Sequence, residues 1–232
     1  MTGIEFAKQF VTTASEYVGE DRANSKAQIA KFLALFGLPF ADDGVPVSYC
    51  AAGASYAAIK AYCLMVGILF TDANAVQVFQ DTISRFASNY FLPSAACHII
   101  RNDAMARGIY VAKGAVTPLP GWLVFYSFDG TGAPDHVEIV KSANASGLNT
   151  IGFNTSDEQL NDPDGGAIDF KSRDYTYVLG YATLYSASDY ATTQALTPDN
   201  PTSLPPLAYA PHAREILTDR QQRESPLTAC QN

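Results

Sequence analysis

The sequence predicts an α+β protein in which a helical half comes before a half made of β-strands. In the first half, apolar residues recur three and four positions apart, which is the spacing of an amphipathic helix. After Pro118 the chain instead consists of aromatic and β-branched runs separated by short turns. This order differs from the alternating strands and helices of a parallel α/β sheet, so we expect helices packed on an antiparallel sheet.

Four helical segments are expected before Pro118. The first places its aromatic residues on one face, and the second ends where Gly37 and Pro39 follow. The third comes directly after Cys50 and is rich in alanine and glycine, so another element can approach it closely. The predicted helices span residues 5–18, 25–36, 51–69 and 74–107.

Four consecutive strands are expected in the second half. Short turns such as DGTGAP and NASG lie between them and predict an antiparallel meander. From residue 188 the chain is rich in proline, threonine and serine, which is typical of a linker or a surface tail. We therefore expect one domain over residues 1–187 and a C-terminal tail over 188–232, with a short helix near its end. The predicted strands lie in PGWLVFYSF, DHVEIVKSA, NTIGFNTS and YTYVLGYATLY.

The composition is that of a globular protein with an acidic balance. A chain of 232 residues, 47% hydrophobic and 16% charged, is long enough to bury a full core. Its net charge of −8 argues against nucleic-acid binding, which requires a basic face. The N-terminus lacks the features of a signal peptide, and the apolar runs are too short to cross a membrane. We expect synthesis in the cytoplasm without a signal peptide, and no membrane insertion.

The cysteines do not have the spacing of a metal site. Cys50, Cys63, Cys97 and Cys230 form no C-x-x-C pair and have few histidines near them, so we predict neither structural zinc nor another cofactor. A disulfide, for example between Cys63 and Cys97, stays open because connectivity cannot be deduced from sequence alone.

Cys50 lies at the junction between an extended run and a helix, in VPVSYCAAGAS. A thiol that begins a helix lies near unpaired backbone N–H groups and the positive end of the helix dipole, and both favour a thiolate. This is the position of a nucleophile, and the alternative interpretation is a small buried apolar residue. Ser55, in GASYA, is a weaker candidate because it lies inside the predicted helix and lacks the second glycine of a nucleophile elbow.

A cysteine nucleophile requires a base and a group that orients the base. His136 is the best candidate for the base because it opens a predicted strand, whereas His98 and His212 lie in a helix and in the tail. Asn154, on the next strand, can accept the second imidazole N–H. Glu138 shares a strand face with His136 and is a candidate for substrate contact, with a solvated strand residue as the alternative.

The motifs occur in the order YCAAGAS, PGWLVFY, DHVEIV, TIGFNTS and VLGYATL. In this order and spacing they resemble the CHAP group of cysteine amidases and peptidases in the NlpC/P60 superfamily. That group carries W-C-A-A, P-G-D-[LIV]-V-F-F, H-V-x-I-V and G-N-T-S type motifs. The resemblance covers roughly residues 14–186. It implies a papain-like fold, with N-terminal helices, the nucleophile at a helix start, and an antiparallel sheet packed against them.

Residue by residue, the resemblance implies Cys50 as the nucleophile, His136 as the base and Asn154 as the polar residue behind the histidine. Residues 66–117 form a long stretch between the cysteine helix and the first core strand. We expect this stretch to be a helical insertion or an enlarged helical region that shapes the substrate cleft. Three positions depart from the family pattern. Tyr49 stands where tryptophan is usual, and Trp122 stands where an acidic residue is usual. Gly152 stands where some relatives carry a glutamate.

The resemblance also implies peptidoglycan as the substrate, with an amide bond cleaved through a thioester acyl-enzyme. Either the bond between sugar and stem peptide or a bond within the stem and cross-bridge fits. Because peptidoglycan lies outside the cytosol, an enzyme without an export signal needs a delivery route. An antibacterial toxin sent through a secretion system, with an immunity protein that occludes its site, fits the acidic charge better than a phage-type endolysin released by lysis.

Two other classes of function stay open. One is a catalytically idle member of the fold that acts as a binding module, in which the cysteine can be replaced without loss of function. The other is an intracellular cysteine protease or acyltransferase. Neighbouring genes would discriminate among these classes, because an immunity-like reading frame supports a toxin and a holin-like one supports an endolysin.

Overall fold

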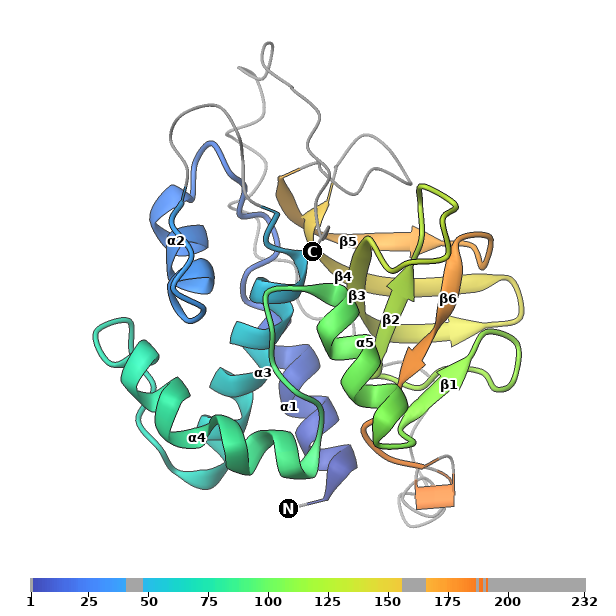
Figure 1. The fold of residues 1–232 in the computed structure, drawn as a ribbon, viewed down its shortest axis with the longest axis horizontal. Coiled ribbons are helices and arrows are strands. Elements are labelled where there is room, and N and C mark those ends of the chain that lie inside the picture. Colours follow the sequence, from blue (N-terminus) through green and yellow to red (C-terminus); the bar gives the residue numbers. More distant parts are fainter. Residues whose placement is uncertain (1, 41–47, 156–165, 187, 190, 192–232) are drawn as a thin grey trace.

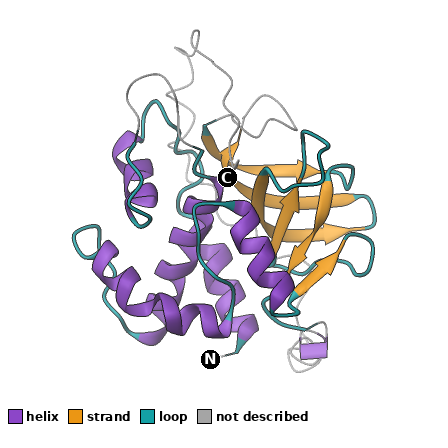
Figure 2. Cartoon of the chain, viewed as in Figure 1, coloured by secondary structure: helices purple, strands orange, loops and turns teal. Residues whose placement is uncertain are grey.

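The computed structural model describes residues 2–40, 48–155, 166–186, 188–189 and 191. It confirms an α+β protein, in which the helices come first along the chain and an antiparallel sheet follows (Figures 1 and 2). The helices are Gly3–Ser15 (α1), Lys26–Ala34 (α2), Cys50–Val66 (α3), Ala75–Asn89 (α4) and Cys97–Ala106 (α5). The strands are Tyr110–Ala112 (β1), Leu123–Tyr126 (β2), His136–Asn144 (β3), Gly147–Thr155 (β4), Ala167–Arg173 (β5) and Val178–Ala182 (β6).

The helices follow the predicted segments, with one additional break. α1 begins at a capping box, in which Thr2 Oγ1 accepts the Glu5 N–H at 3.2 Å and the Glu5 carboxylate accepts the Thr2 N–H at 2.8 Å. The segment predicted over 74–107 divides into α4 and α5. Pro93 lies in the break, where its missing N–H and its ring disfavour a continuous helix.

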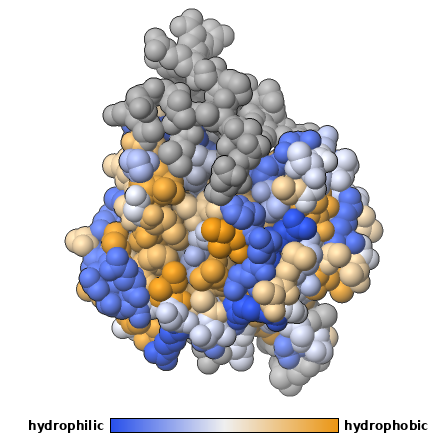
Figure 3. All heavy atoms as spheres, viewed as in Figure 1, coloured by the Kyte–Doolittle hydropathy of each residue, from blue (hydrophilic) through white to orange (hydrophobic). Residues whose placement is uncertain are grey.

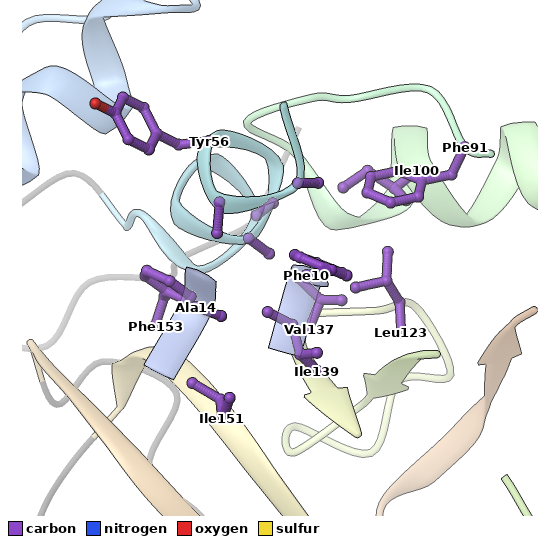
Figure 4. Packing of buried hydrophobic residues seen from close by; sticks show 14 of the residues in the cluster. Phe10, Ala14, Tyr56, Phe91, Ile100, Leu123, Val137, Ile139, Ile151 and Phe153 are labelled. Carbon is purple, nitrogen blue, oxygen red and sulfur yellow. The ribbon is translucent and has the colours of Figure 1, made fainter. Parts of the chain in front are cut away.

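α3 is the central helix of the fold, and its side chains are buried on nearly every side from Cys50 to Cys63. Its small residues allow the close approach that the sequence predicts. A Cβ added at Gly53 would lie 2.2 Å from Phe153 Cδ1 of β4. Figure 4 shows Phe10, Val137 and Phe153 converging on the side of α3 that faces the sheet. The cysteine at the start of α3 is therefore fixed against β3 and β4.

The sheet has the strand order β1-β6-β2-β3-β4-β5, and every adjacent pair is antiparallel. β2 to β5 form the predicted type of meander, but β6 returns to pair with β2. β1 and β5 were not predicted. β1 has only three residues, and β5 buries the charged Lys171 and Arg173 where alternation would favour apolar residues.

The stretch over residues 66–117 is integrated into the core. Phe6 of α1 stacks on Tyr90 with ring centroids 3.9 Å apart and meets Phe86 of α4 edge-on at 5.5 Å. Aromatic pairs of this kind contribute beyond the area they bury. Residues 66–117 thus support α1 and α3, and they bring the start of α5 to the start of α3.

The helical half also presents apolar residues at the surface. Figure 3 shows apolar residues gathered over this half of the visible face. In the described part of the chain, no helix is both long enough and apolar enough to span a bilayer. Exposed large apolar side chains lie near the ends of α2, α3 and α4, at Leu38, Leu64, Leu69 and Val76.

Two predictions lie outside the described residues. The extended run before Cys50 falls largely within residues 41–47. Nearly all of the predicted tail over 188–232, including its short helix, is also outside them.

Candidate active site

Cys50 is the first residue of α3, and its side chain is 1% exposed. Tyr49, the residue before it, makes no side-chain cap to this helix of 17 residues. A helix start without a side-chain cap leaves first-turn N–H groups able to bind an anion, and the dipole adds to this effect. The Ser48 hydroxyl donates to Cys50 Sγ at 3.6 Å. The start of α3 therefore provides a polar, positively polarised surrounding for the sulfur.

His136 opens β3, where it pairs with Tyr126 of β2, and it is fully buried. Its Nε2 lies 3.2 Å from Glu138 Oε1. Its Nδ1 has no hydrogen-bond partner among the described residues, and because Nε2 lies at Glu138, Nδ1 is the ring nitrogen left to face the neighbouring Cys50. The ring also lies beside Phe128, with centroids 5.7 Å apart. The histidine is held on a rigid strand, with one nitrogen occupied by a carboxylate.

Glu138 is a buried carboxylate with partners on three strands. Arg173 of β5 donates to Oε1 through Nη2 at 2.6 Å, and Thr150 of β4 donates its hydroxyl to Oε2 at 2.6 Å. Burial alone would raise the pKa of Glu138, but the hydrogen bond with His136 and the charge of Arg173 hold this pKa well below its usual range. The carboxylate therefore stays ionised behind the histidine.

The pKa of His136 reflects both of its acidic neighbours. Burial lowers the pKa of this imidazole, but the neighbouring Cys50 and the hydrogen-bonded Glu138, with their negative charges, outweigh burial and raise it to about 9. The structure therefore favours an imidazolium between the sulfur and the carboxylate at neutral pH. Asp135, the preceding residue, is buried, and burial raises its pKa to about 6.

Asn154 has different neighbours from those that the sequence predicted. Its Nδ2 donates to Ser48 Oγ at 3.1 Å, and Arg22 donates to its Oδ1. Its backbone is in the left-handed region, with φ of 55°, which asparagine tolerates better than most residues. These contacts place Asn154 in a chain that leads through Ser48 to Cys50. The acceptor at His136 Nε2 is instead Glu138.

The position of Glu138 also differs from the prediction of substrate contact. Its side chain is 1% exposed, and its oxygens already accept bonds from buried donors. Glu138 pairs directly with Gly152 across the β3–β4 ladder, and a Cβ at residue 152 would lie 2.8 Å from Glu138 Oε1. Gly152 thus leaves room for a carboxylate from the adjacent strand.

Cys97 is a neighbour of the site that sequence reasoning missed. Its Sγ lies 3.4 Å from Cys50 Sγ, and both residues are buried. The three described cysteines are thiols rather than disulfides, and the sulfur next to Cys97 belongs to Cys50, not to Cys63. The available signal was the segment PSAAC, in which a proline and small residues come before Cys97 and favour a helix start there.

The other positions singled out in the sequence have structural contacts. Ser55 is buried inside α3 and exchanges hydrogen bonds with the backbone of Ser94. The Tyr49 hydroxyl donates to the Gly166 carbonyl at 2.6 Å. Trp122 is buried beside Tyr185. Among the residues that the structure describes, no group of three or more His, Cys, Asp or Glu is placed to hold a metal ion.

The fold and the site together define an α+β protein with a cysteine at a helix start, beside a histidine whose other nitrogen is held by a carboxylate. No protein-family model matches the chain, and no curated protein matches it.

Proposed function

We propose that this protein is a CHAP-type cysteine hydrolase of the NlpC/P60 superfamily that cleaves amide bonds of peptidoglycan. One observation carries the proposal: Cys50, at the start of α3, interacts with His136, whose Nε2 is held by Glu138. The packing of α3 against the antiparallel sheet that carries His136 supports a papain-like fold. The motif order around these residues supports peptidoglycan as the substrate class.

In the proposed reaction, the Cys50 thiolate attacks the amide carbonyl carbon and forms a tetrahedral intermediate. Backbone N–H groups of the first turn of α3 stabilise its oxyanion. The His136 imidazolium gives its proton to the departing amine, which leaves a thioester on Cys50. Neutral His136 then takes a proton from water, and the hydroxide releases the acid and regenerates the thiolate.

In this mechanism Glu138 is the positioning residue behind His136. Its carboxylate fixes the orientation of the ring and stabilises the imidazolium, as the acidic member of a catalytic triad does. Arg173 and Thr150 fix the carboxylate in turn. Asn154, through Ser48, instead acts on the cysteine side of the site.

We further propose delivery into rival bacteria through a secretion system, with a cognate immunity protein that occludes the site. The acidic net charge of −8 supports this route over adsorption to an anionic cell surface. Expression of the chain with a periplasmic export signal tests the route. If the protein is such a toxin, the exported chain lyses Gram-negative cells and the chain kept in the cytoplasm does not. Coexpression of an immunity-like neighbouring gene then restores growth of the cells that export it.

A catalytically idle binding module is the second candidate, because one observation favours it. Cys50 is 1% exposed and His136 is fully buried, so a substrate carbonyl reaches the sulfur only after neighbouring groups move. Reaction of Cys50 with iodoacetamide in the folded protein separates the two candidates. A reactive thiol at neutral pH favours the hydrolase, and a thiol that reacts only after unfolding favours the module.

Digestion of purified peptidoglycan tests the hydrolase directly. We expect wild type to release soluble fragments and Cys50→Ala to lose at least about 10³-fold of this rate, since the residual catalysis without a nucleophile is small. Cys63→Ala is a matched control, because Cys63 is a buried thiol of the same helix without a place in the site. Fragment masses identify the bond. Intact sacculi of several wall chemistries after exposure to folded wild type would exclude this substrate.

A further inference from the structure

Two thiols meet inside the candidate site. Cys50 begins α3 and Cys97 begins α5, and their sulfur atoms are 3.4 Å apart. A disulfide bond needs about 2.0 Å between the sulfurs, so the two atoms must move about 1.4 Å closer to form one. The two residues are far apart in the sequence, and neither is exposed.

Hydrogen bonds fix the segment before α5 against α3. The Ser55 hydroxyl donates to the Ser94 carbonyl at 2.9 Å and accepts the Ser94 N–H at 3.1 Å. The Ser94 hydroxyl in turn accepts the Ala96 N–H at 3.1 Å, directly before Cys97. Because Ser55 is a buried residue of α3, this connection determines where α5 starts relative to Cys50. The contact between the sulfurs is therefore supported by the core on both sides.

We propose that Cys50 and Cys97 form a modification site at which a hydroperoxide converts the nucleophile reversibly into a disulfide. Cys50 thiolate attacks the peroxide, the O–O bond breaks, and Cys50 becomes a sulfenic acid as hydroxide leaves. The Cys97 thiolate then attacks the Cys50 sulfur, forms the S–S bond and expels hydroxide. Overall, two thiols and one hydrogen peroxide give one disulfide and two molecules of water. A dithiol reverses the change and is itself oxidised to a disulfide.

The consequence for activity rests on the proposed function, but the modification site does not. A disulfide removes the nucleophile, so the hydrolase would be inactive until it is reduced. It also prevents further oxidation of Cys50 to sulfinic acid, which ordinary thiols do not reverse. Cys63 lacks this chemistry, because burial raises the pKa of its thiol to about 11 and disfavours the reactive thiolate.

Peptide mapping of the full chain tests the site independently of activity. The lysines and arginines of the sequence place Cys50, Cys63, Cys97 and Cys230 in four different tryptic peptides. We treat folded protein with hydrogen peroxide, block remaining thiols with an alkylating reagent, and digest without reduction. The expected product links peptide 32–60 to peptide 86–101. It disappears when dithiothreitol is added before alkylation.

Variants identify Cys97 as the residue that resolves the oxidised nucleophile. After peroxide and then dithiothreitol, wild type and Cys63→Ala are expected to regain most of their alkylatable Cys50 thiol. Cys97→Ala should regain less than about a tenth, with sulfinic acid on Cys50 instead. Cys97→Ser, which keeps the side chain's size, replaces Cys97→Ala if the latter unfolds by circular dichroism.

The outcomes separate this proposal from the proposed function. If no peptide links Cys50 to Cys97, and Cys50 is overoxidised equally in wild type and Cys97→Ala, the modification site is overturned. If the linked peptide forms in a protein that digests no peptidoglycan, the modification site stands and the hydrolase fails. If the disulfide forms and peptidoglycan digestion stops and then returns with dithiothreitol, both are supported.

Discussion

At the scale of single residues, the environment of His136 differs most from the sequence prediction. The sequence left Glu138 as a candidate for substrate contact or as a solvated strand residue, yet it is buried, with its Oε1 3.2 Å from His136 Nε2. Asn154 was expected at that nitrogen, yet it donates to Ser48 on the cysteine side. The site therefore combines two separate hydrogen-bond chains, one that ends on the imidazole and one that ends on the sulfur.

Replacement of Glu138 by glutamine tests the imidazole chain. Glu138→Gln keeps the shape but removes the charge that stabilises the His136 imidazolium, so we expect peptidoglycan hydrolysis to fall about 10²- to 10⁴-fold, as in other triads that lose their acid. The alkaline limit of the pH–rate profile should also move to lower pH, because a negative charge that raises the pKa of His136 is lost. A purely structural role would not move this limit.

The control for Glu138→Gln concerns Arg173, which would become a buried cation without its counterion. Breaking one side of a buried pair costs about 3–5 kcal/mol, so the single variant needs a stability measurement by urea unfolding. The double variant Glu138→Gln with Arg173→Met removes both charges and should regain stability without regaining activity. Full activity in the double variant would show that the carboxylate does not act on His136.

Ser48 and Asn154 allow a test of the cysteine chain. Ser48→Ala removes the hydroxyl that donates to Cys50 Sγ at 3.6 Å, and we expect alkylation of Cys50 at neutral pH to slow about tenfold, the effect of one hydrogen bond to a charged group. Asn154→Gly, which retains the left-handed backbone, should slow the alkylation of Cys50 by a similar factor. The double variant should react only slightly more slowly than either single variant. Additive effects would place Asn154 outside this chain.

The sequence indicated the candidate residues Cys50 and His136 better than it indicated their partners. A cysteine before alanines and glycine at a helix start, and a histidine at a strand start, can be recognised from local pattern alone. Glu138 and Ser48 lie two positions from His136 and Cys50, but the groups that fix them depend on strand register, and the place of Cys97 depends on which helix starts meet in space. Neither is encoded in a short window of sequence.

At the scale of elements, the close packing of α3 on β4 determines where Cys50 lies. Gly53 is one turn after Cys50, and a Cβ there would overlap Phe153. Gly53→Ala should therefore lower the free energy of unfolding by about 1–3 kcal/mol, the usual cost of overpacking a core. Thermal unfolding measures this loss.

Gly67 offers a matched control for Gly53. It ends α3 with φ of 73°, and a Cβ there would meet no atom within 4 Å. Gly67→Ala tests the backbone cost of a methyl group without the steric cost, and it should destabilise by about 1 kcal/mol or less without altering the reactivity of Cys50. If Gly53→Ala and Gly67→Ala change the reactivity of Cys50 equally, the packing of α3 on β4 does not determine the position of Cys50.

The elements that the sequence missed have weak local signals for identifiable reasons. β5 begins at Ala167 and buries the charged Lys171 and Arg173. Arg173 forms an ion pair with the buried Glu138. A strand with buried charges does not show apolar alternation. Pro93 lies in the break between α4 and α5, whereas the prediction placed a single helical region across it.

At the scale of the whole molecule, the buried ion pair at His136 makes stability depend on pH. The pKa of His136 is about 9 in the folded protein against an ordinary value of 6.5. Below about pH 6.5 the imidazole is protonated in both folded and unfolded chains, and the full stabilisation is present. As pH rises toward about 9, only the folded chain retains the imidazole proton, so the contribution of His136 to the free energy of unfolding falls through this window.

NMR titration of the His136 ring checks this prediction. We expect a midpoint near pH 9 in wild type and a lower midpoint in Cys50→Ala, which lacks one of the groups that raise the pKa. Asp135, whose pKa is raised to about 6, titrates at lower pH and is present in both proteins, so it does not account for the difference. A midpoint near 6.5 in both proteins would contradict an imidazolium at this position.

Under the proposed CHAP membership, Glu138 of β3 takes the place of the glutamate that some members carry at the position of Gly152 on β4, and this affects how such relatives can be recognised. Glu138 and Gly152 are directly paired across the β3–β4 ladder. A side chain at residue 152 would enter the space that the Glu138 carboxylate occupies beside His136. A comparison that scores each alignment column separately registers two unfavourable changes, a lost acid in one column and an unexpected acid in another. A comparison that scores facing positions together registers a single acid retained in place. The ancestry of such sites is better traced through paired columns than through individual ones.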